Sequence, residues 1–291
     1  MSRNGLELVK QGDERFCKAL YSAADSVCAT KDLKIIRLSG PTCAGKTTAA
    51  KMIVKRMSEN GKHAVPISID DFYYDCDVLH EMSAKKGLDT PDYDSPDTID
   101  IEAMARFVSD ITTKGEAYCP VFDFNTGKSD TYRKVTLGEN DILIFEGIQA
   151  VYPQVLEIFG DEKPDCIFIA PRDVECEGGE IFDPNEIRLM RRIVRDDRFR
   201  GTSASETMAL WKNVRANEEK NIFPYVEDCK YRINSSMPYD LGVLKPHLEA
   251  AIGEPSGEYR EEFEAMLKKI SGIEPISSEY INEDSLYKEF V

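Results

Sequence analysis

Short apolar runs alternate with longer amphipathic segments along most of the chain. The apolar runs that resemble buried strands lie at 33–38, 65–69, 142–145 and 166–170. Around them, apolar residues recur every three or four positions, as in helices with one buried face, over 6–28, 47–57, 101–112, 185–199, 204–220 and 241–252. Strands that alternate with helices are typical of a mostly parallel sheet covered on both faces. The pattern therefore predicts an α/β fold.

The segments 117–135 and 253–291 depart from this alternation. The first holds two β-rich pieces around the turn sequence NTGK at 125–128, which predicts a hairpin that projects from the sheet. The second contains one further helical pattern at 258–270, followed by an acidic tail with serine and tyrosine residues. We expect this tail to have little core-forming power and to be appended rather than catalytic.

Composition and charge narrow the class of protein. The chain has 291 residues, of which 42% are hydrophobic and 31% charged, so disorder over most of its length is excluded. Its net charge of −16 disfavours binding to nucleic acid or to an anionic membrane. Eight cysteines without a CxxC pair and three scattered histidines disfavour a zinc site. Without a signal peptide or a membrane span, we expect reduced thiols and a cytoplasmic location.

A phosphate-binding loop is the strongest signal in the sequence. Residues 40–47 read GPTCAGKT, which matches GxxxxGK[ST] between an apolar run and a helical pattern. Its glycines allow backbone conformations that point N–H groups at a phosphate, and the following helix adds its positive end. Lys46 can bridge the β- and γ-phosphates, and Thr47 can offer its hydroxyl to Mg²⁺. The loop predicts a nucleotide site formed by Gly40, Thr42, Cys43, Ala44, Gly45, Lys46, Thr47 and Thr48.

Carboxylates follow two of the expected strands. Asp70 comes after the run at 65–69, and Glu146 comes after the run at 142–145. Ligands of open α/β sheets bind at the carboxyl ends of strands. Asp70 could hold an acceptor hydroxyl, take its proton and contact the metal shell, while Glu146 could bind Mg²⁺ directly or through water. In the alternative interpretation, Asp70 is a solvated loop residue or a helix cap, and Glu146 is a residue that faces solvent where the chain leaves the sheet.

Arginines are concentrated in the helical pattern at 185–199 and directly after it. They occupy positions 188, 191, 192, 195, 198 and 200, and the first four share one helix face. On a closing lid, such arginines could neutralise the charge that develops on a transferring phosphoryl group and exclude water. The alternative is a solvated helix whose arginines pair with Glu186, Asp196 and Asp197.

These motifs together resemble the uridine kinase and phosphoribulokinase family of P-loop kinases. The resemblance runs from about residue 35 to about residue 246, through GPTCAGKTT, SIDDFYYD, DYDSPDTID, PVFDF, IFEGIQA and RLMRRIVRD. The sequences EEKNIFPY and PISSEYINEDSLYKEF are similar to a long bacterial branch of uridine-kinase-like proteins. The resemblance implies a P-loop NTPase fold of the nucleoside monophosphate kinase type, with a five-stranded parallel sheet, helices on both faces, a β-hairpin and a helical lid. We expect this domain at 33–252 with the lid at about 185–220, an N-terminal helical extension at 1–32 and a C-terminal acidic extension at 253–291.

The resemblance also implies roles for individual residues. Asp70 corresponds to the general base, Thr47, Asp70 and Glu146 to the Mg²⁺ site, and Asp94 to a carboxylate that binds ribose hydroxyls. Aromatic positions around the nucleoside correspond to Tyr73, Tyr93, Phe122 and Phe124, and lid positions to Arg192, Arg195 and Arg200. Lys46, Asp70, Arg195 and Arg200 would then be catalytic, and Arg192 would bind the nucleotide. Alternatively, Asp94 or Asp97 caps the helix that begins near Ile99, and Phe122 and Phe124 belong to the core.

Departures from the family pattern concern the acceptor. Gly127 stands where uridine–cytidine kinases usually carry a histidine, and Thr202 and Leu210 stand where arginine and glutamine are common. Loss of base-reading groups relaxes or redirects selectivity. The expected activity is Mg²⁺-dependent transfer from ATP or GTP to the 5′-hydroxyl of a nucleoside, uridine or cytidine by resemblance. The alternatives are another small acceptor, or a nucleotide-binding regulatory protein without transfer activity. The sequence leaves the oligomeric state open, a homo-oligomer included.

Overall fold

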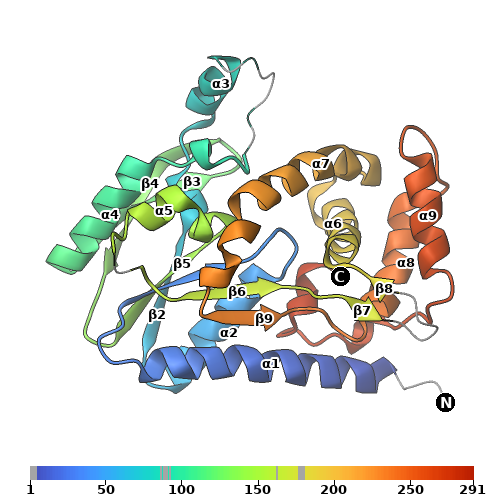
Figure 1. The fold of residues 1–291 in the computed structure, drawn as a ribbon, viewed down its shortest axis with the longest axis horizontal. Helices are drawn as coiled ribbons and strands as arrows, with labels where there is room; N and C mark the ends of the chain where they lie inside the picture. The colour runs from blue at the N-terminus through green and yellow to red at the C-terminus, as the bar shows by residue number, and fades with distance from the viewer. Residues whose placement is uncertain (1–4, 86, 88–90, 92, 162, 176–180) are drawn as a thin grey trace.

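A five-stranded parallel sheet forms the centre of the molecule (Figure 1). The computed structural model describes residues 5–85, 87, 91, 93–161, 163–175 and 181–291. The strands are β1 (Ile35–Ser39), β2 (His63–Ser68), β5 (Asp141–Glu146), β6 (Cys166–Ala170) and β9 (Tyr231–Asn234), in the order β2-β5-β1-β6-β9. This order places the carboxyl ends of β2 and β1 on either side of β5.

Helices cover both faces of the sheet, as the sequence pattern predicts. One face packs against α1 (Gly5–Ala29), α2 (Lys46–Glu59), α6 (Pro184–Arg200) and α8 (Asp240–Ile252), and the other against α4 (Ile101–Lys114) and α5 (Pro153–Glu157). In Figure 1, α1 runs below the sheet and α4 lies at its upper left. Ile142 and Ile144 of β5 are buried in the first core cluster, whereas Leu143 and Phe145 of the same strand are buried in the second. Alternate side chains therefore fill two cores, which confirms the α/β class.

The remaining elements build the hairpin, the predicted lid, formed by α6 and α7, and the C-terminal region. An antiparallel hairpin joins β3 (Glu116–Asp123) to β4 (Lys128–Thr136), and a shorter one joins β7 (Val174–Glu175) to β8 (Ile181–Phe182). The helices are α3 (Cys76–Lys85), α7 (Ala204–Asn221) and α9 (Arg260–Ile270). Both α6 and α7 begin with a capping box, formed by Asp183 with Glu186 and by Ser203 with Glu206. Because each box satisfies N–H groups at a helix start, the lid helices have sharply defined beginnings.

The pattern did not predict β9, α3, α5 or the short hairpin of β7 and β8. The edge strand β9 alternates partly buried and exposed positions around the buried Ile233, so its four residues carry little hydrophobic signal. The helix α3 buries only Leu79 and Ser83. The sequence also has an acidic stretch at 173–185, whose glycine pair at 178–179 lies outside the described residues.

The C-terminal tail is part of the core, so the expectation of little core-forming power is wrong. Five of its apolar side chains are buried, namely Ile281, Leu286, Tyr287, Phe290 and Val291. They belong to the same core cluster as the buried faces of α1, α2 and α6. Their irregular spacing among exposed acidic residues such as Glu283 hides them from a search for helix or strand periodicity.

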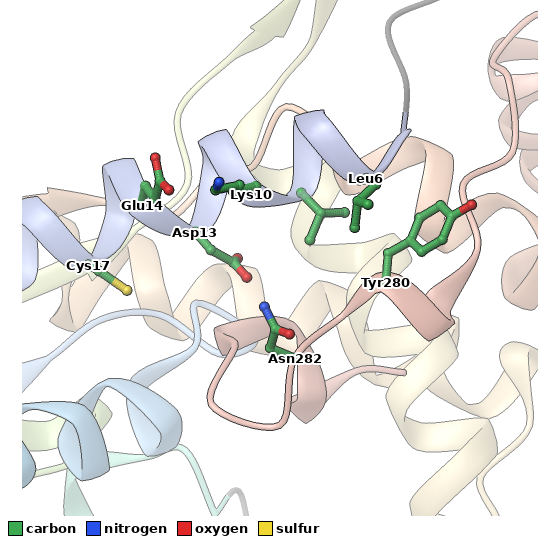
Figure 2. Close-up of a pocket in the computed structure, with 8 residues that line it drawn as sticks. Leu6, Lys10, Asp13, Glu14, Cys17, Tyr280 and Asn282 are labelled. Atoms are coloured by element: carbon green, nitrogen blue, oxygen red, sulfur yellow. The ribbon is translucent and has the colours of Figure 1, made fainter.

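A pocket of about 410 Å³ lies between α1 and the tail (Figure 2). Its lining residues are Leu6, Val9, Lys10, Asp13, Glu14, Cys17, Tyr280 and Asn282. None of these residues belongs to the loop at 40–47 or to the carboxyl end of a strand of the central sheet. Within the described residues, no helix is both long enough and apolar enough to span a bilayer.

Candidate functional site

The phosphate-binding loop joins β1 to α2 and has the backbone that its glycines allow. Gly45 has φ 91° and caps the N-terminus of α2, and Cys43 has φ 57°. A backbone in which right- and left-handed residues alternate turns successive N–H groups toward one concave side, which favours an anion. A Cβ at Gly40 would overlap the carbonyl oxygen of Ile169. The glycines of the motif are therefore required by φ at position 45 and by packing at position 40.

Residues of the lid helices hold the outside of this loop. Glu218 of α7 accepts the N–H of Thr42 at 3.2 Å and binds Arg188 of α6 through distances of 2.5 and 2.7 Å. Arg188 and Glu218 are 1% and 2% exposed, so this ion pair is buried. The sequence analysis missed Glu218, although it lies in the EEKNIFPY motif. The pair connects the two lid helices to the loop.

Arg191 links the phosphate-binding loop to α8 and to the C-terminal segment, by which we mean the tail at 271–291. Its guanidinium donates to the carbonyl of Cys43 at 3.3 Å and forms a fully buried ion pair with Asp240 at 2.7 Å. The rings of Tyr287 and Phe290 stack on the same guanidinium, 5.3 and 5.1 Å from Cζ. Arg191 is therefore a buried structural residue. The sequence analysis expected this helix face to be solvated or to face a phosphate, which is wrong for Arg191.

The strand order brings the predicted catalytic side chains to one edge of the sheet. Glu146 ends β5 opposite Leu38 of β1 and Ser68 of β2, and Asp70 lies in the short 3₁₀ turn after β2. Burial raises the pKa of Glu146, and the charge of Lys46 opposes this shift. The structure thus places Lys46, Asp70 and Glu146 together, although they lie far apart in the sequence.

Lys46 is half-buried at this edge of the sheet, and the carboxylates of Glu146, Asp70 and Glu289 lie around it. Its ammonium donates to the carbonyl of Pro41 at 3.0 Å. Burial lowers the pKa of Lys46, and the charges of Glu289 and Glu146 oppose that change. Glu289 belongs to the C-terminal segment, so this segment contributes to the electrostatics of the predicted nucleotide site.

The adjacent aspartates have different partners. Asp70 accepts a hydrogen bond of 2.8 Å from the side-chain amide of Gln149. Asp71 accepts the N–H of Phe122 at 3.3 Å and lies 3.7 Å from the guanidinium of Arg133, both in the hairpin. Burial raises the pKa of Asp71. Asp71 therefore fastens the hairpin to the sheet, and Asp70 remains the residue that can face a substrate.

One buried carboxylate organises the three predicted lid arginines. Asp196, 3% exposed, binds Arg195 at 2.7 and 2.9 Å and Arg192 at 3.3 Å, and it lies 3.6 Å from Nε of Arg200. The alternative interpretation, in which the arginines pair with nearby acidic residues, is correct for Asp196. It is wrong in placing this pairing on a solvated helix, because Asp196 is buried. The arginines are held as one cluster, whose contact with a phosphate stays a prediction.

Comparison with known proteins identifies the domain that carries this geometry. Residues 35–168 match the model of the phosphoribulokinase / uridine kinase family. This segment of the chain is similar to that family. A uridine kinase of Ureaplasma parvum is 29% identical over 185 residues, which cover 64% of this chain and 79% of that protein. Uridine-cytidine kinase 2-B of Danio rerio is 26% identical over 201 residues, covering 65% and 67% of the two chains.

Solved structures agree on the fold of this kinase. The YGR205w protein superimposes with a TM-score of 0.51 at 15% identity, covering 78% of this chain and 90% of the other. A protein of Silicibacter sp. TM1040, provisionally described as a fructose transport system kinase, has the same TM-score at 19% identity and covers 69% of this chain and 94% of its own. At these identities the likeness concerns the fold alone. The family match and the curated relatives indicate an ATP-dependent kinase.

The predicted acceptor side of the site contains an aromatic cluster. The ring of Tyr73 lies 5.6 Å from that of Phe122 and 6.5 Å from that of Phe124, and the last two are 5.1 Å apart. Phe122 is 6% exposed and Phe124 is 69% exposed. The core alternative therefore holds for Phe122 and is wrong for Phe124. Tyr93, 42% exposed, lies nearby because its carbonyl accepts the Tyr73 hydroxyl at 3.1 Å.

The capping alternative for Asp94 and Asp97 is wrong. The N-cap of α4 is Asp100, which accepts the N–H of Ala103 at 2.8 Å, and Ser95 caps the preceding 3₁₀ turn. The carbonyl of Asp94 accepts the Tyr152 hydroxyl at 2.9 Å, so its main chain is fixed near the aromatic cluster. The ribose-binding role of Asp94 stays a prediction.

The positions that depart from the pyrimidine-kinase pattern have clear structural settings. Gly127 forms the hairpin turn with φ 68°, and a Cβ there would overlap the sulfur of Cys76. A histidine at this position would be strained in this backbone. Leu210 is 50% exposed on α7. The kinase therefore has no base-reading polar side chain at either of these two positions.

Proposed function

We propose that this kinase transfers the γ-phosphoryl group of MgATP to the 5′-hydroxyl of a nucleoside, with uridine and cytidine as the first candidates. The observation that carries the proposal is the meeting of Lys46, Glu146 and Asp70 at one edge of the sheet, near Tyr73, whose ring lies 6.5 Å from the exposed ring of Phe124. The relatives named uridine kinase and uridine-cytidine kinase support the class of acceptor.

The chemistry follows from the positions of these groups. The loop N–H groups and Lys46 would bind the β- and γ-phosphates. The acceptor hydroxyl oxygen forms a bond to the γ-phosphorus as the bond to the β–γ bridging oxygen breaks, and Asp70 accepts the hydroxyl proton. The arginines around Asp196 would stabilise the charge on the transferred group and exclude water when the lid closes.

The site also has ligands that suit Mg²⁺. In kinases this ion is usually held by one or two protein oxygen ligands together with the substrate phosphates. The hydroxyl of Thr47, exposed at the start of α2, and the carboxylate of Glu146 are hard oxygen donors at this edge of the sheet. When bound, the ion would neutralise phosphate charge during transfer.

A transfer panel tests the proposed function. Radiolabelled ATP and GTP are offered with the common nucleosides, ribose compounds and sugar phosphates, and phosphorylated products are separated. We expect Asp70→Asn to bind MgATP normally but to lower kcat by about 10²–10⁴-fold, since a positioned base is lost. Asp77→Asn, which changes an exposed aspartate of α3, is the matched control. Near-normal turnover by Asp70→Asn contradicts the assignment of the base.

The settings of Gly127 and Leu210 favour a second candidate, in which the same chemistry acts on a different acceptor. Without base-reading groups at these positions, a purine nucleoside or another ribosyl compound would be accepted as readily. Preferential phosphorylation of such a compound in the panel selects this candidate. MgATP binding without any product supports a regulatory protein instead.

A further inference from the structure

Gln149 is a buried polar residue directly beside Asp70. It lies in the 3₁₀ turn Ile148–Val151, three residues after Glu146, and is 1% exposed. Its Nε2 donates to Oδ1 of Asp70 at 2.8 Å and to the hydroxyl of Tyr73 at 2.7 Å. One amide group therefore contacts both the predicted base and the aromatic cluster.

The main chain on both sides of Gln149 is anchored to β1. The hydroxyl of Ser39 donates to the carbonyl of Ile148 at 3.1 Å, and the buried guanidinium of Arg37 donates to the carbonyl of Ala150 at 2.7 Å. The amide thus projects from a turn that the central strand holds in place. Its position is set before any substrate binds.

The side-chain oxygen of Gln149, Oε1, forms no hydrogen bond with the described residues. This oxygen is buried. A buried polar atom without a partner destabilises the fold, and an apolar side chain of similar shape would avoid that cost. An amide retained at such a position indicates a functional role for its N–H groups.

We propose that Gln149 is a positioning residue for the general base, a proposal that rests on the kinase activity proposed above. The amide holds Oδ1 of Asp70 and leaves Oδ2 to accept the acceptor hydroxyl. A hydrogen bond donated to a carboxylate is charge-assisted and directional, so it fixes the orientation of the Asp70 side chain. Because the same amide binds Tyr73, whose ring contacts Phe122 and Phe124, it also links the base to the acceptor site.

Two substitutions separate positioning from packing. Gln149→Met keeps a similar volume without the N–H groups, and Gln149→Glu places a second carboxylate beside Asp70. With MgATP and uridine, we expect Gln149→Met to lower kcat by about 10- to 100-fold with KM for MgATP within about twofold, because orientation of the base acts on the chemical step. Its thermal midpoint should not fall. A residue with a structural role alone would lower stability and leave kcat unchanged.

The pH profile gives an independent readout. Two carboxylates in contact share a proton, so fewer molecules hold an ionised base at a given pH. We therefore expect Gln149→Glu to move the acidic limb of the kcat profile to higher pH. Gln154→Glu, at a half-buried glutamine of α5, adds the same charge away from Asp70 and should leave the profile unchanged.

A double-mutant cycle tests the link to the acceptor site. Tyr73→Phe removes only the hydroxyl that Gln149 contacts, so its effect on kcat should be smaller in the Gln149→Met background than in the wild type. If the transfer panel shows that another acceptor is a better substrate than uridine, the same kinetic measurements are made with that acceptor. An active wild type whose kcat and pH profile survive both Gln149 substitutions overturns this proposal alone. A wild type that phosphorylates no acceptor overturns the proposed function, and the role of Gln149 with it.

Discussion

The side chain of Leu286 packs directly against Gly45 of the phosphate-binding loop. Leu286 begins the 3₁₀ turn Leu286–Glu289 and is 1% exposed, and a Cβ added to Gly45 would overlap its side chain. Gly45 has φ 91°, so both its backbone conformation and its neighbour require glycine. The C-terminal segment is therefore a structural support of the loop, whose geometry depends on residues more than two hundred positions away.

Leu286→Ala should weaken both the fold and the loop. Removing a buried leucine side chain typically lowers the free energy of unfolding by about 3 kcal/mol, and here the cavity would open beside Gly45. We expect weaker MgATP binding as well, because the loop loses a contact that holds its conformation. Urea denaturation and calorimetry measure the two effects.

The control for this experiment is Leu6→Ala, at a leucine of α1 that is 50% exposed. Exposed substitutions usually change stability by no more than about 0.5 kcal/mol. If Leu286→Ala is destabilised but binds MgATP as tightly as the wild type, the segment stabilises the core without supporting the loop.

Glu218→Gln should uncouple the lid helices from the loop. The substitution leaves the buried guanidinium of Arg188 without its counter-charge, and breaking a buried ion pair on one side costs about 3–5 kcal/mol. It also weakens the acceptor for the N–H of Thr42, so MgATP affinity should fall. Glu219→Gln is the matched control, because Glu219 is 68% exposed and binds Arg215 at 3.0 Å. Equal effects of the two substitutions would show that burial of the Arg188 pair has no special role.

Local signals explain what the sequence predicted correctly. The loop at 40–47 combines a fixed spacing of glycines with a strand before it and a helix after it, so its location and its flanking elements follow from adjacent residues. The positions of Asp70 and Glu146 at strand ends follow from two apolar runs in the same way. Their meeting depends on the strand order, which the pairing of β5 with β1 and β2 shows and no local pattern in the sequence contains.

Long-range contacts explain what the sequence analysis missed. Gln149 has an evident role only once Asp70, 79 positions away in the chain, is seen beside it. Glu218 is one of several acidic residues on α7, and nothing in the neighbouring sequence distinguishes it from Glu219. Leu286 stands in an acidic tail without periodicity. In each case the meaning of the residue comes from a partner in another element, which no local pattern contains.

Phe124→Ala should weaken acceptor binding selectively. Stacking of a base on an aromatic side chain contributes about 1–3 kcal/mol, so KM for a nucleoside acceptor should rise about tenfold or more. KM for MgATP and stability should change little, because the ring is 69% exposed. Steady-state kinetics with each substrate varied in turn provide the measurement.

The matched control is Tyr132→Ala, which removes an exposed aromatic ring from the same hairpin, with 64% exposure. A rise in acceptor KM for both variants would indicate a general effect on the hairpin. An unchanged KM for Phe124→Ala would remove this ring from the acceptor site.

Glu146→Gln should stabilise the free protein at neutral pH while it weakens MgATP binding. Burial raises the pKa of Glu146, so ionisation of this carboxyl opposes folding. Its contribution to stability is fully present below the ordinary pKa of a glutamate and is lost as the pH rises through the raised value. The neutral amide avoids that loss but cannot supply the charge that a divalent cation needs.

The advantage of Glu146→Gln in urea unfolding should therefore be larger at about pH 7.5 than at about pH 5.5, where more of the wild-type carboxyl is protonated. Calorimetry at the higher pH should show weaker MgATP binding by the variant. Glu139→Gln, at an exposed glutamate just before β5, is expected to change neither property. A stability difference that does not vary with pH would mean that the variant acts through packing, and unchanged MgATP affinity would remove Glu146 from the metal site.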